Sequence, residues 1–197
     1  IHQNEPYHPV KDKGFYFTLC DDIYPDSLKV LKNPPFVLYY RGNLNLLQSE
    51  CVSVIGSRNA LPYASKWTEI VVKELSKNYV IVSGLAKGID GLAHEVALEY
   101  GSTIAILGCG IDVIYPICNK DLYHKIMKNG LILSEYPGKT EVRKHQFVMR
   151  NRIIAGLGQS LFLMQSNLKS GSMITVNVAL DCGKDVTCLP FNCDQVE

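Results

Sequence analysis

Basic and aromatic side chains are interleaved over residues 144–152, which read Lys-His-Gln-Phe-Val-Met-Arg-Asn-Arg. Lys and Arg can hold phosphates while a ring between them stacks on a base, the combination that single-stranded nucleic acid requires. From Gly138 to Arg152, five Lys or Arg stand against one acid, Glu141, whereas the whole chain has a formal charge of only +1. The positive charge is therefore local. The candidate nucleic-acid contacts of this run are Lys144, Phe147, Arg150, Asn151 and Arg152.

The same run also fits an ordinary amphipathic helix that begins near residue 148. Arg150 and Arg152 would then be solvated, and Phe147 would pack beneath the helix. Lys144 and Phe147 are expected in the loop before that helix, and the apolar residues from Ile153 onward in the core. The residue pattern alone leaves both interpretations open.

Three further segments place small residues where a strand is expected to end. Glycine lets a backbone approach a phosphate, serine offers a hydroxyl, and arginine offers two parallel N–H donors. Such residues also serve as ordinary caps and turns, so a structural role is the alternative for each. The candidate phosphate contacts in these turns are Gly56, Ser57, Arg58, Ser83, Gly84, Lys87, Gly88, Ser170, Gly171 and Ser172.

Several common sites are not indicated by the sequence. No Gly-x-x-x-x-Gly-Lys-Ser/Thr segment occurs, and Gly108-Cys-Gly110 lacks the third glycine of a dinucleotide fingerprint. None of the seven Cys forms a Cys-x-x-Cys pair, which predicts reduced thiols and no metal site. Asp90 and His94 share one face of an expected helix, where ordinary side-chain pairing explains them as well as catalysis does. No catalytic residue and no cofactor is predicted.

Short apolar segments alternate with helical patterns from Cys51 onward. Strands without polar alternation are typical of a parallel sheet covered on both faces, and right-handed crossovers then give a doubly wound, mostly parallel α/β fold of extended Rossmann-like type. The expected strands are 36–40, 51–55, 79–82, 103–107, 131–133, 161–164 and 186–189. The expected helices are 62–76, 89–100, 119–128, 148–156 and 172–181.

Length and composition fit one globular domain with a small appendage. The chain has 197 residues, of which 47% are hydrophobic and 20% charged. We expect residues 1–45 to be an extension leading into the fold, and residues 46–197 to be the Rossmann-like domain. No run approaches 18 apolar residues, so no membrane span is expected. The polar start without Met, and the polar end, suggest a piece of a longer protein.

Taken together, these segments resemble the DNA-processing protein A family (DprA, also called Smf) between about residues 24 and 190. The segments that carry the resemblance are Pro35–Gly42, Val54–Arg58, Val82–Asp90, Ala105–Pro116, Leu133–Pro137, Arg150–Gly156 and Ser170–Thr175. The resemblance implies a cytoplasmic protein that binds single-stranded DNA with little sequence preference and acts without catalytic turnover. It also implies a homodimer that loads the RecA recombinase on incoming DNA during natural transformation (competence).

The resemblance further implies that Arg58 is a phosphate ligand and that Lys144 and Phe147 belong to a DNA-contacting loop. Two departures qualify it. The family often has His-Phe-Pro before Arg-Asn-Arg, whereas this chain has Gln146-Phe147-Val148. The family's C-terminal winged-helix-like domain is not evident in the sequence, and neither is a clear N-terminal helical domain. The alternative function is a nucleotide-binding enzyme of phosphoribohydrolase type, whose Pro-Gly-Gly-x-Gly-Thr pattern does not occur here.

Overall fold

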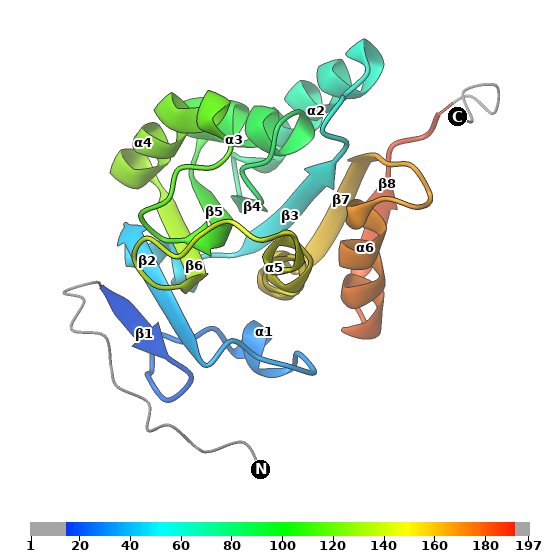
Figure 1. Cartoon of the computed structure of the whole chain (residues 1–197). Helices are drawn as coiled ribbons and strands as arrows, with labels where there is room; N and C mark the ends of the chain where they lie inside the picture. Colours follow the sequence, from blue (N-terminus) through cyan, green and yellow to red (C-terminus); the bar gives the residue numbers. More distant parts are fainter. Residues whose placement is uncertain (1–14, 192–197) are drawn as a thin grey trace.

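The apolar segments form one mixed sheet in the computed structural model, which describes residues 15–191 (Figure 1). Eight strands lie in the described part, in the order β1-β2-β6-β5-β4-β3-β7-β8. The pairs from β6 through β8 are parallel, whereas β1 and β2 are antiparallel to their neighbours. The strands are β1 (Tyr16–Thr18), β2 (Val37–Gly42), β3 (Cys51–Gly56), β4 (Val80–Ser83), β5 (Thr103–Gly110), β6 (Leu131–Tyr136), β7 (Ser160–Gln165) and β8 (Asp185–Cys188).

Helices cover both faces of this sheet, as the apolar strands require. Strand β5 is buried along its whole length, and β3 is buried except at its last residue. The α-helices are α1 (Asp26–Lys29), α2 (Pro62–Leu75), α3 (Ile89–Tyr100), α4 (Lys120–Asn129), α5 (Lys144–Leu157) and α6 (Gly171–Asp181). Two short 3-10 helices are η1 (Leu44–Gln48) and η2 (Ile117–Asn119). The doubly wound, mostly parallel α/β fold is thereby confirmed.

The hydrophobic core is divided by the sheet. Helices α2, α3 and α4 lie on one face, and α5, α6 and α1 lie on the other (Figure 1). Ile81, for example, packs with α2 and α3 residues, whereas its neighbour Val82 packs with α5 residues. Successive side chains of a strand point to opposite faces, so one strand contributes to both layers of core.

The direction of winding changes between β3 and β7. Strands β3, β4, β5 and β6 follow one another across the sheet, and α5 then returns the chain to the other side of β3. Strands β3 and β7 are therefore neighbours although about a hundred residues separate them in the chain. Ligands of open α/β sheets bind at such a point, beyond the carboxyl ends of the strands.

The expected extension contributes strands to the same sheet. The strand predicted at 36–40 is β2, which pairs antiparallel with β6, and β1 then pairs with β2. The short elements β1, α1 and η1 were not predicted. The division of the chain at residue 45 stays a prediction. No helix within residues 15–191 is both long enough and apolar enough to cross a membrane, and the expectation about the polar start of the chain falls outside the described residues.

The start of α5 corrects one expectation. The helix begins at Lys144, not near Val148, so Lys144 and Phe147 lie in its first turn and not in a loop. The backbone N–H of Arg143 donates to the Gln146 side chain at 2.7 Å, which satisfies a donor at the helix start. Gln146 thus stabilises the helix start at Lys144.

Candidate nucleic-acid interface

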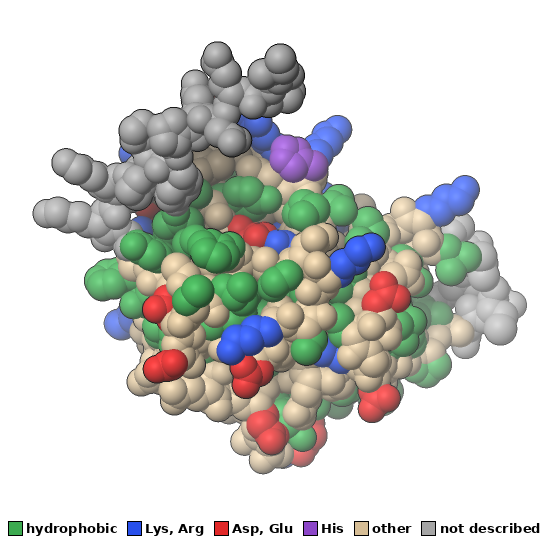
Figure 2. All heavy atoms as spheres, turned by 90° about the horizontal axis from the view of Figure 1, so that it is seen from below, with side chains coloured by type: hydrophobic (Ala, Val, Ile, Leu, Met, Phe, Trp, Pro, Cys, Tyr) green, Lys and Arg blue, Asp and Glu red, His purple; other side chains and the backbone are tan. Residues whose placement is uncertain are grey.

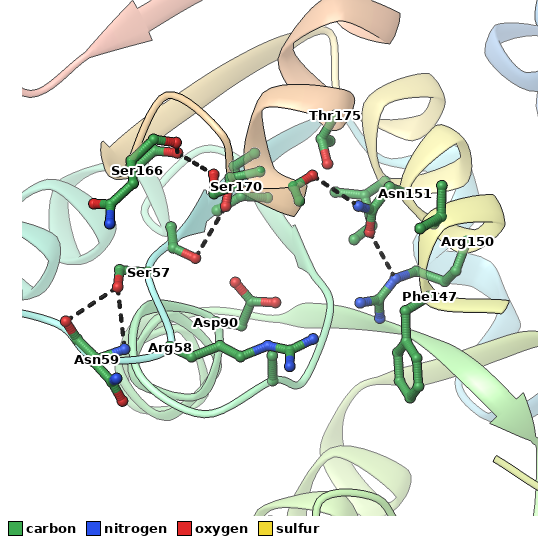
Figure 3. A pocket seen from close by; sticks show the side chains of 18 of the residues that line it. Ser57, Arg58, Asn59, Asp90, Phe147, Arg150, Asn151, Ser166, Ser170 and Thr175 are labelled. Carbon is green, nitrogen blue, oxygen red and sulfur yellow. Dashed lines mark hydrogen bonds between the residues drawn. The ribbon is translucent and has the colours of Figure 1, made fainter. Parts of the chain in front are cut away.

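A cavity of about 580 Å³ opens at the carboxyl ends of β3 and β7 (Figure 3). Its walls come from the turn after β3, the first two turns of α5 and the segment that leads from β7 into α6. Sequence segments separated by more than a hundred residues meet there. Ten predicted residues line it: Gly56, Ser57, Arg58, Lys144, Phe147, Arg150, Asn151, Ser170, Gly171 and Ser172.

The turn after β3 presents Arg58 and is fixed from behind. The Asn59 N–H donates to the Ser57 hydroxyl at 3.1 Å, and the Ile89 N–H donates to the Ser57 carbonyl at 3.1 Å. Gly88 has φ 75° and lies so close that a Cβ there would be 2.3 Å from the Ser57 carbonyl oxygen. Gly88 therefore supports the turn from outside the cavity. Within the described residues, Arg58 is exposed and has no hydrogen bond or ion pair.

The segment before α6 is tied to both neighbouring walls. The Ser172 hydroxyl donates to the Gly56 carbonyl at 3.2 Å, and the Asn151 amide donates to the Gly171 carbonyl at 3.1 Å. The hydroxyls of Ser166 and Ser170 lie 2.5 Å apart. These contacts position the first turn of α6 at the cavity, where backbone N–H groups of a helix start attract anions.

Lys144 and Phe147 form the wall contributed by α5. Lys144 is exposed, with no ion pair among the described residues. The Phe147 ring is half-buried and packs on Tyr115, with ring centroids 5.4 Å apart and planes tilted by 46°. A Cβ on Gly108 would lie 2.7 Å from Phe147 Cδ1, so the glycine lets α5 approach β5. Part of the ring is thus used in packing, and the rest lines the cavity.

Arg150 lies at the floor of the cavity and is only 5% exposed. Its Nη1 donates to the Gly84 carbonyl at 2.6 Å and to the Ile106 carbonyl. Its Nε donates to the Asn151 side chain at 3.3 Å. The guanidinium therefore holds the ends of β4 and β5 together, and most of its donors are unavailable to a strand at the cavity mouth.

Asp90 and His94 do not pair with each other. Burial raises the pKa of Asp90, while Arg150 and the backbone N–H groups of Ala86, Gly56 and Gly84 lower it. Burial lowers the pKa of His94 to about 3, so its ring is neutral.

The His94 ring lies within a chain of hydrogen bonds. Its Nε2 accepts from the Leu85 N–H at 3.3 Å, so Nδ1 carries the proton and donates to Thr103 at 2.7 Å. The Thr103 hydroxyl donates in turn to the Ile81 carbonyl. The neutral ring thus connects the turn after β4 to the sheet.

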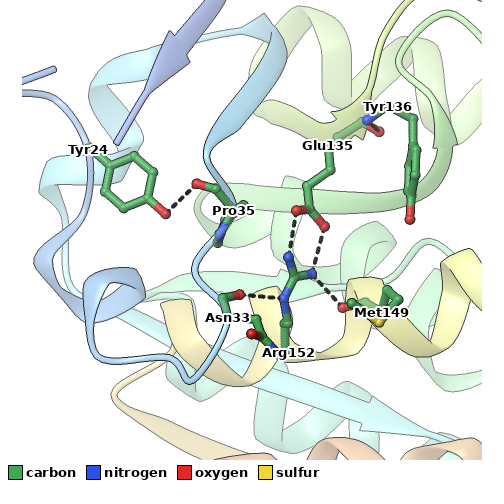
Figure 4. Close-up of polar contacts among 8 residues, drawn as sticks. Tyr24, Asn33, Pro35, Glu135, Tyr136, Met149 and Arg152 are labelled. Atoms are coloured by element: carbon green, nitrogen blue, oxygen red, sulfur yellow. Dashed lines mark hydrogen bonds and ion pairs between the residues drawn. The ribbon is translucent and has the colours of Figure 1, made fainter. Parts of the chain in front are cut away.

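Arg152 belongs to a different part of the molecule (Figure 4). Its guanidinium pairs with both carboxylate oxygens of Glu135, at 2.6 and 2.5 Å, and donates to the Asn33 and Met149 carbonyls. The pair joins α5 to β6 and to the segment before β2. The placement corrects the expectation that Arg152 lies beside Arg150 at one rim.

Four other predicted residues also lie outside the cavity. The Ser83 hydroxyl is buried and donates to the Val54 carbonyl at 2.6 Å. Gly84 is packed between Arg150 and Asp90, where a Cβ would lie 2.6 Å from an atom of each. Lys87 is exposed on the turn before Gly88. Ser83, Gly84 and Gly88 therefore shape the cavity from behind, and Lys87 lies next to the turn that carries Arg58.

Six lining residues with polar or aromatic side chains were not predicted: Asn59, Asp90, Tyr115, Ser166, Asn167 and Thr175. Ser166 and Asn167 directly follow β7, so the strand-end argument applied to the other turns would have found them. Thr175 comes four residues after Gly171 in α6, so the helical periodicity places both residues on the same face of the helix. Tyr115 and Phe147 are distant in sequence and give no such signal.

The described residues offer no metal site. No group of three or more His, Cys, Asp or Glu between residues 15 and 191 is arranged to hold an ion. The lower face of the molecule shows hydrophobic areas broken by isolated Lys, Arg, Asp and Glu side chains (Figure 2). Positive charge is therefore not gathered on that face.

Comparison with known proteins gives a consistent result. Residues 15–197 match the family model of DNA recombination-mediator protein A. DNA processing protein DprA of Streptococcus pneumoniae is 45% identical over 176 residues, and protein Smf of Synechocystis is 42% identical over 196 residues. These matches cover 88% and 96% of this chain but only 62% and 49% of the relatives. The chain thus spans about half to three fifths of their length.

Two solved structures are similar throughout the described fold. The X-ray structure of DprA from S. pneumoniae has a TM-score of 0.90 at 42% identity, covering 93% of this chain and 65% of that one. A structure of DNA processing protein A from Helicobacter pylori has a TM-score of 0.86 at 37% identity, covering 94% and 85%. The latter structure concerns a single-stranded DNA binding mode of the H. pylori protein.

Proposed function

The chain belongs to the DNA recombination-mediator protein A family, and from this premise we propose that it binds single-stranded DNA with little sequence preference. The strand would lie across the cavity at the β3/β7 switch point. Arg58 and Lys144 would contact phosphates from opposite walls, with Lys87 beside them. The exposed part of Phe147 would stack on a base, and the Ser170–Ser172 turn would contact the backbone of the strand.

The observation that carries this proposal is that two cations without ion pairs and an aromatic ring line one cavity. Arg58 and Lys144 come from segments 86 residues apart, and neither has an ion pair within the described residues. Phosphate contacts and stacking on a ring carry no information on base sequence, so these groups support binding with little sequence preference.

The biological role extends beyond this cavity. We propose, from the family, that the protein works in the cytoplasm as a homodimer and loads the RecA recombinase on incoming strands during natural transformation. The H. pylori relative supports the strand-binding part, because its structure concerns a single-stranded DNA binding mode. Assembly and RecA loading need the purified protein together with its own recombinase to be tested.

We propose binding without catalytic turnover, in place of the nucleotide-hydrolase alternative. Asp90 is the only acid among the lining residues, and it is only 6% exposed and engaged with Arg150 and backbone N–H groups. A general acid or base has to reach the proton that it transfers. Release of free base on incubation with nucleoside monophosphates would contradict this proposal.

A binding titration tests the proposed function. Fluorescence anisotropy with single-stranded oligonucleotides of several sequences should give similar affinities, and the matching duplexes should bind more weakly. Lys144→Ala should weaken binding of every sequence alike. Lys128→Ala is the matched control, because Lys128 is exposed in the last turn of α4, at the opposite end of the sheet. Equal effects of the two substitutions, or no binding of single strands, would refute the proposal.

A further inference from the structure

The side chain of Thr175 is buried, but its hydroxyl makes no hydrogen bond inside the described protein. Thr175 is 2% exposed, and its hydroxyl points into the cavity (Figure 3) without a hydrogen-bond partner among residues 15–191. Thr68 in α2 is fully buried, and its hydroxyl donates to the Ala64 carbonyl at 2.7 Å. Ser76 Oγ is the one fully buried side-chain oxygen or nitrogen without a partner among the described residues, so the Thr175 hydroxyl is open to the cavity. It is therefore available to donate to, or accept from, a ligand there.

Arg150 supplies a second and independent indication. Its charge is buried, yet no carboxylate of the described residues lies within ion-pair distance. Burial lowers the pKa of Arg150, and repulsion from Arg58 lowers it further, although Asp90 and Cys109 act in the opposite direction. Asp90 offsets part of this charge but forms no ion pair with Arg150, and Arg58 has none either among the described residues. Two guanidinium groups that line the same cavity without an ion pair would both attract an anion.

The start of α6 completes the surroundings. This helix has eleven residues, and a Cβ on Gly171 would meet no atom within 4 Å, so the helix start is open to a ligand. The charged lining residues are Arg58, Lys144 and Arg150 against Asp90, which gives a formal charge of +2. A phosphomonoester carries about −1.5 to −2 at neutral pH, whereas a phosphodiester carries one negative charge.

We propose that the floor of the cavity is a phosphomonoester site, formed by Arg150, Thr175 and the start of α6, with Arg58 closing it from the opposite wall. Its ligand is the terminal phosphate of a strand or the phosphate of a mononucleotide. A phosphodiester is joined to a nucleoside on each side. A phosphomonoester is joined to only one nucleoside, so its free side can enter a recess. The inference rests on the proposed strand binding at the same cavity, whose mouth would hold the ordinary diesters.

Competition among three strands of one sequence tests this site. One strand carries a 5′-phosphate, one a 3′-phosphate, and one hydroxyls at both ends. One phosphorylated end should bind on the order of tenfold more tightly than the hydroxyl-ended strand. The preference should decline below about pH 6, where the phosphomonoester takes up its second proton. In a separate arm, calorimetry should detect thymidine monophosphate binding and no thymidine binding.

Thr175→Val is the informative variant, since it keeps the shape of the side chain and removes only the hydroxyl. It should reduce the preference for the phosphorylated end while the hydroxyl-ended strand binds as before. Thr68→Val is the control and should leave the preference unchanged. Thermal unfolding of both variants checks that the fold is intact.

The outcomes separate the two proposals. Equal affinities of all three strands, with strand binding intact, would overturn the phosphomonoester site and leave the proposed function standing. Loss of binding by every strand would refute the proposed function, and the mononucleotide arm would then decide the site alone. No heat from thymidine monophosphate in that arm would overturn it.

Discussion

The arginine of the turn after β3 and the two arginines of α5 differ in how far the fold itself uses their side chains. Arg58 is exposed and has no hydrogen bond or ion pair among the described residues, whereas Arg150 and Arg152 each make at least three contacts within the fold. The sequence places more positive charge in α5 than anywhere else, but the structure uses most of it internally. Charge density along a chain is thus a poor measure of the charge available to a ligand.

The largest expected effect concerns Arg150. Arg150→Met removes a buried guanidinium and leaves the Gly84 and Ile106 carbonyls without their donor. We expect the free energy of unfolding to fall by about 3–5 kcal/mol, measured by urea denaturation. Arg58→Met is the matched control and should change stability by less than about 0.5 kcal/mol. Wild-type stability of Arg150→Met would mean that Arg150 is as free as Arg58.

The next effect concerns the neutral His94 behind the cavity. Its pKa is about 3 in the folded protein, whereas an unfolded histidine takes up a proton near 6.5. Between these two pH values the unfolded state binds more protons than the folded state. The contribution of neutral His94 to the free energy of unfolding is therefore full above pH 6.5 and is lost as the pH falls. At pH 5 the loss amounts to about 2 kcal/mol relative to pH 7.

Comparison with His94→Gln isolates that contribution. Asp90, whose pKa is raised by burial, acts in the opposite direction as the pH falls, but it is present in both proteins. The difference between wild type and variant in urea denaturation at pH 7 and pH 5 should therefore report His94 alone. Identical pH dependence in the two proteins would show that the ring is accessible to protons and that the region behind the cavity is open.

A smaller loss is expected for the pair of Arg152 with Glu135. Their side chains are 13% and 19% exposed, and two charge-assisted hydrogen bonds join them. A double-mutant cycle with Arg152→Ala and Glu135→Ala should give a coupling energy of about 1–2 kcal/mol in unfolding. Affinity for single strands should stay at the wild-type value. A lowered affinity without a stability change would place Arg152 with Arg58 as a strand contact.

The smallest effect is expected for Phe147. Stacking on a base contributes about 1–3 kcal/mol per base, and the low end applies because Tyr115 already holds part of the ring. Phe147→Leu should weaken strand binding by about fivefold, while the dependence on salt stays the same. Anisotropy titrations at two salt concentrations measure both quantities. Unchanged affinity would make Phe147 a packing residue only.

The sequence predicted the fold well because its strands are apolar runs bounded by turns. Two of the three predicted turns, Gly56–Arg58 and Ser170–Ser172, line the cavity, whereas the predicted residues of the Ser83–Gly88 turn lie outside it. The roles of Arg150 and Arg152 were missed although both lay within the helix predicted at 148–156. Residues two apart on a helix point about 200° away from each other, so the helical periodicity alone would have separated the two arginines. Their partners, Gly84, Ile106 and Glu135, are distant in sequence and give no local signal.

The salt dependence of strand affinity tests the central claim most directly. Each phosphate contact to a single strand contributes a slope of about −0.7 in log affinity against log salt. We predict that Arg58→Ala flattens the slope by about that amount, and that Arg152→Ala leaves it unchanged. Flattening by Arg152→Ala equal to that of Arg58→Ala would contradict the account, because the α5 charge would then contact the strand.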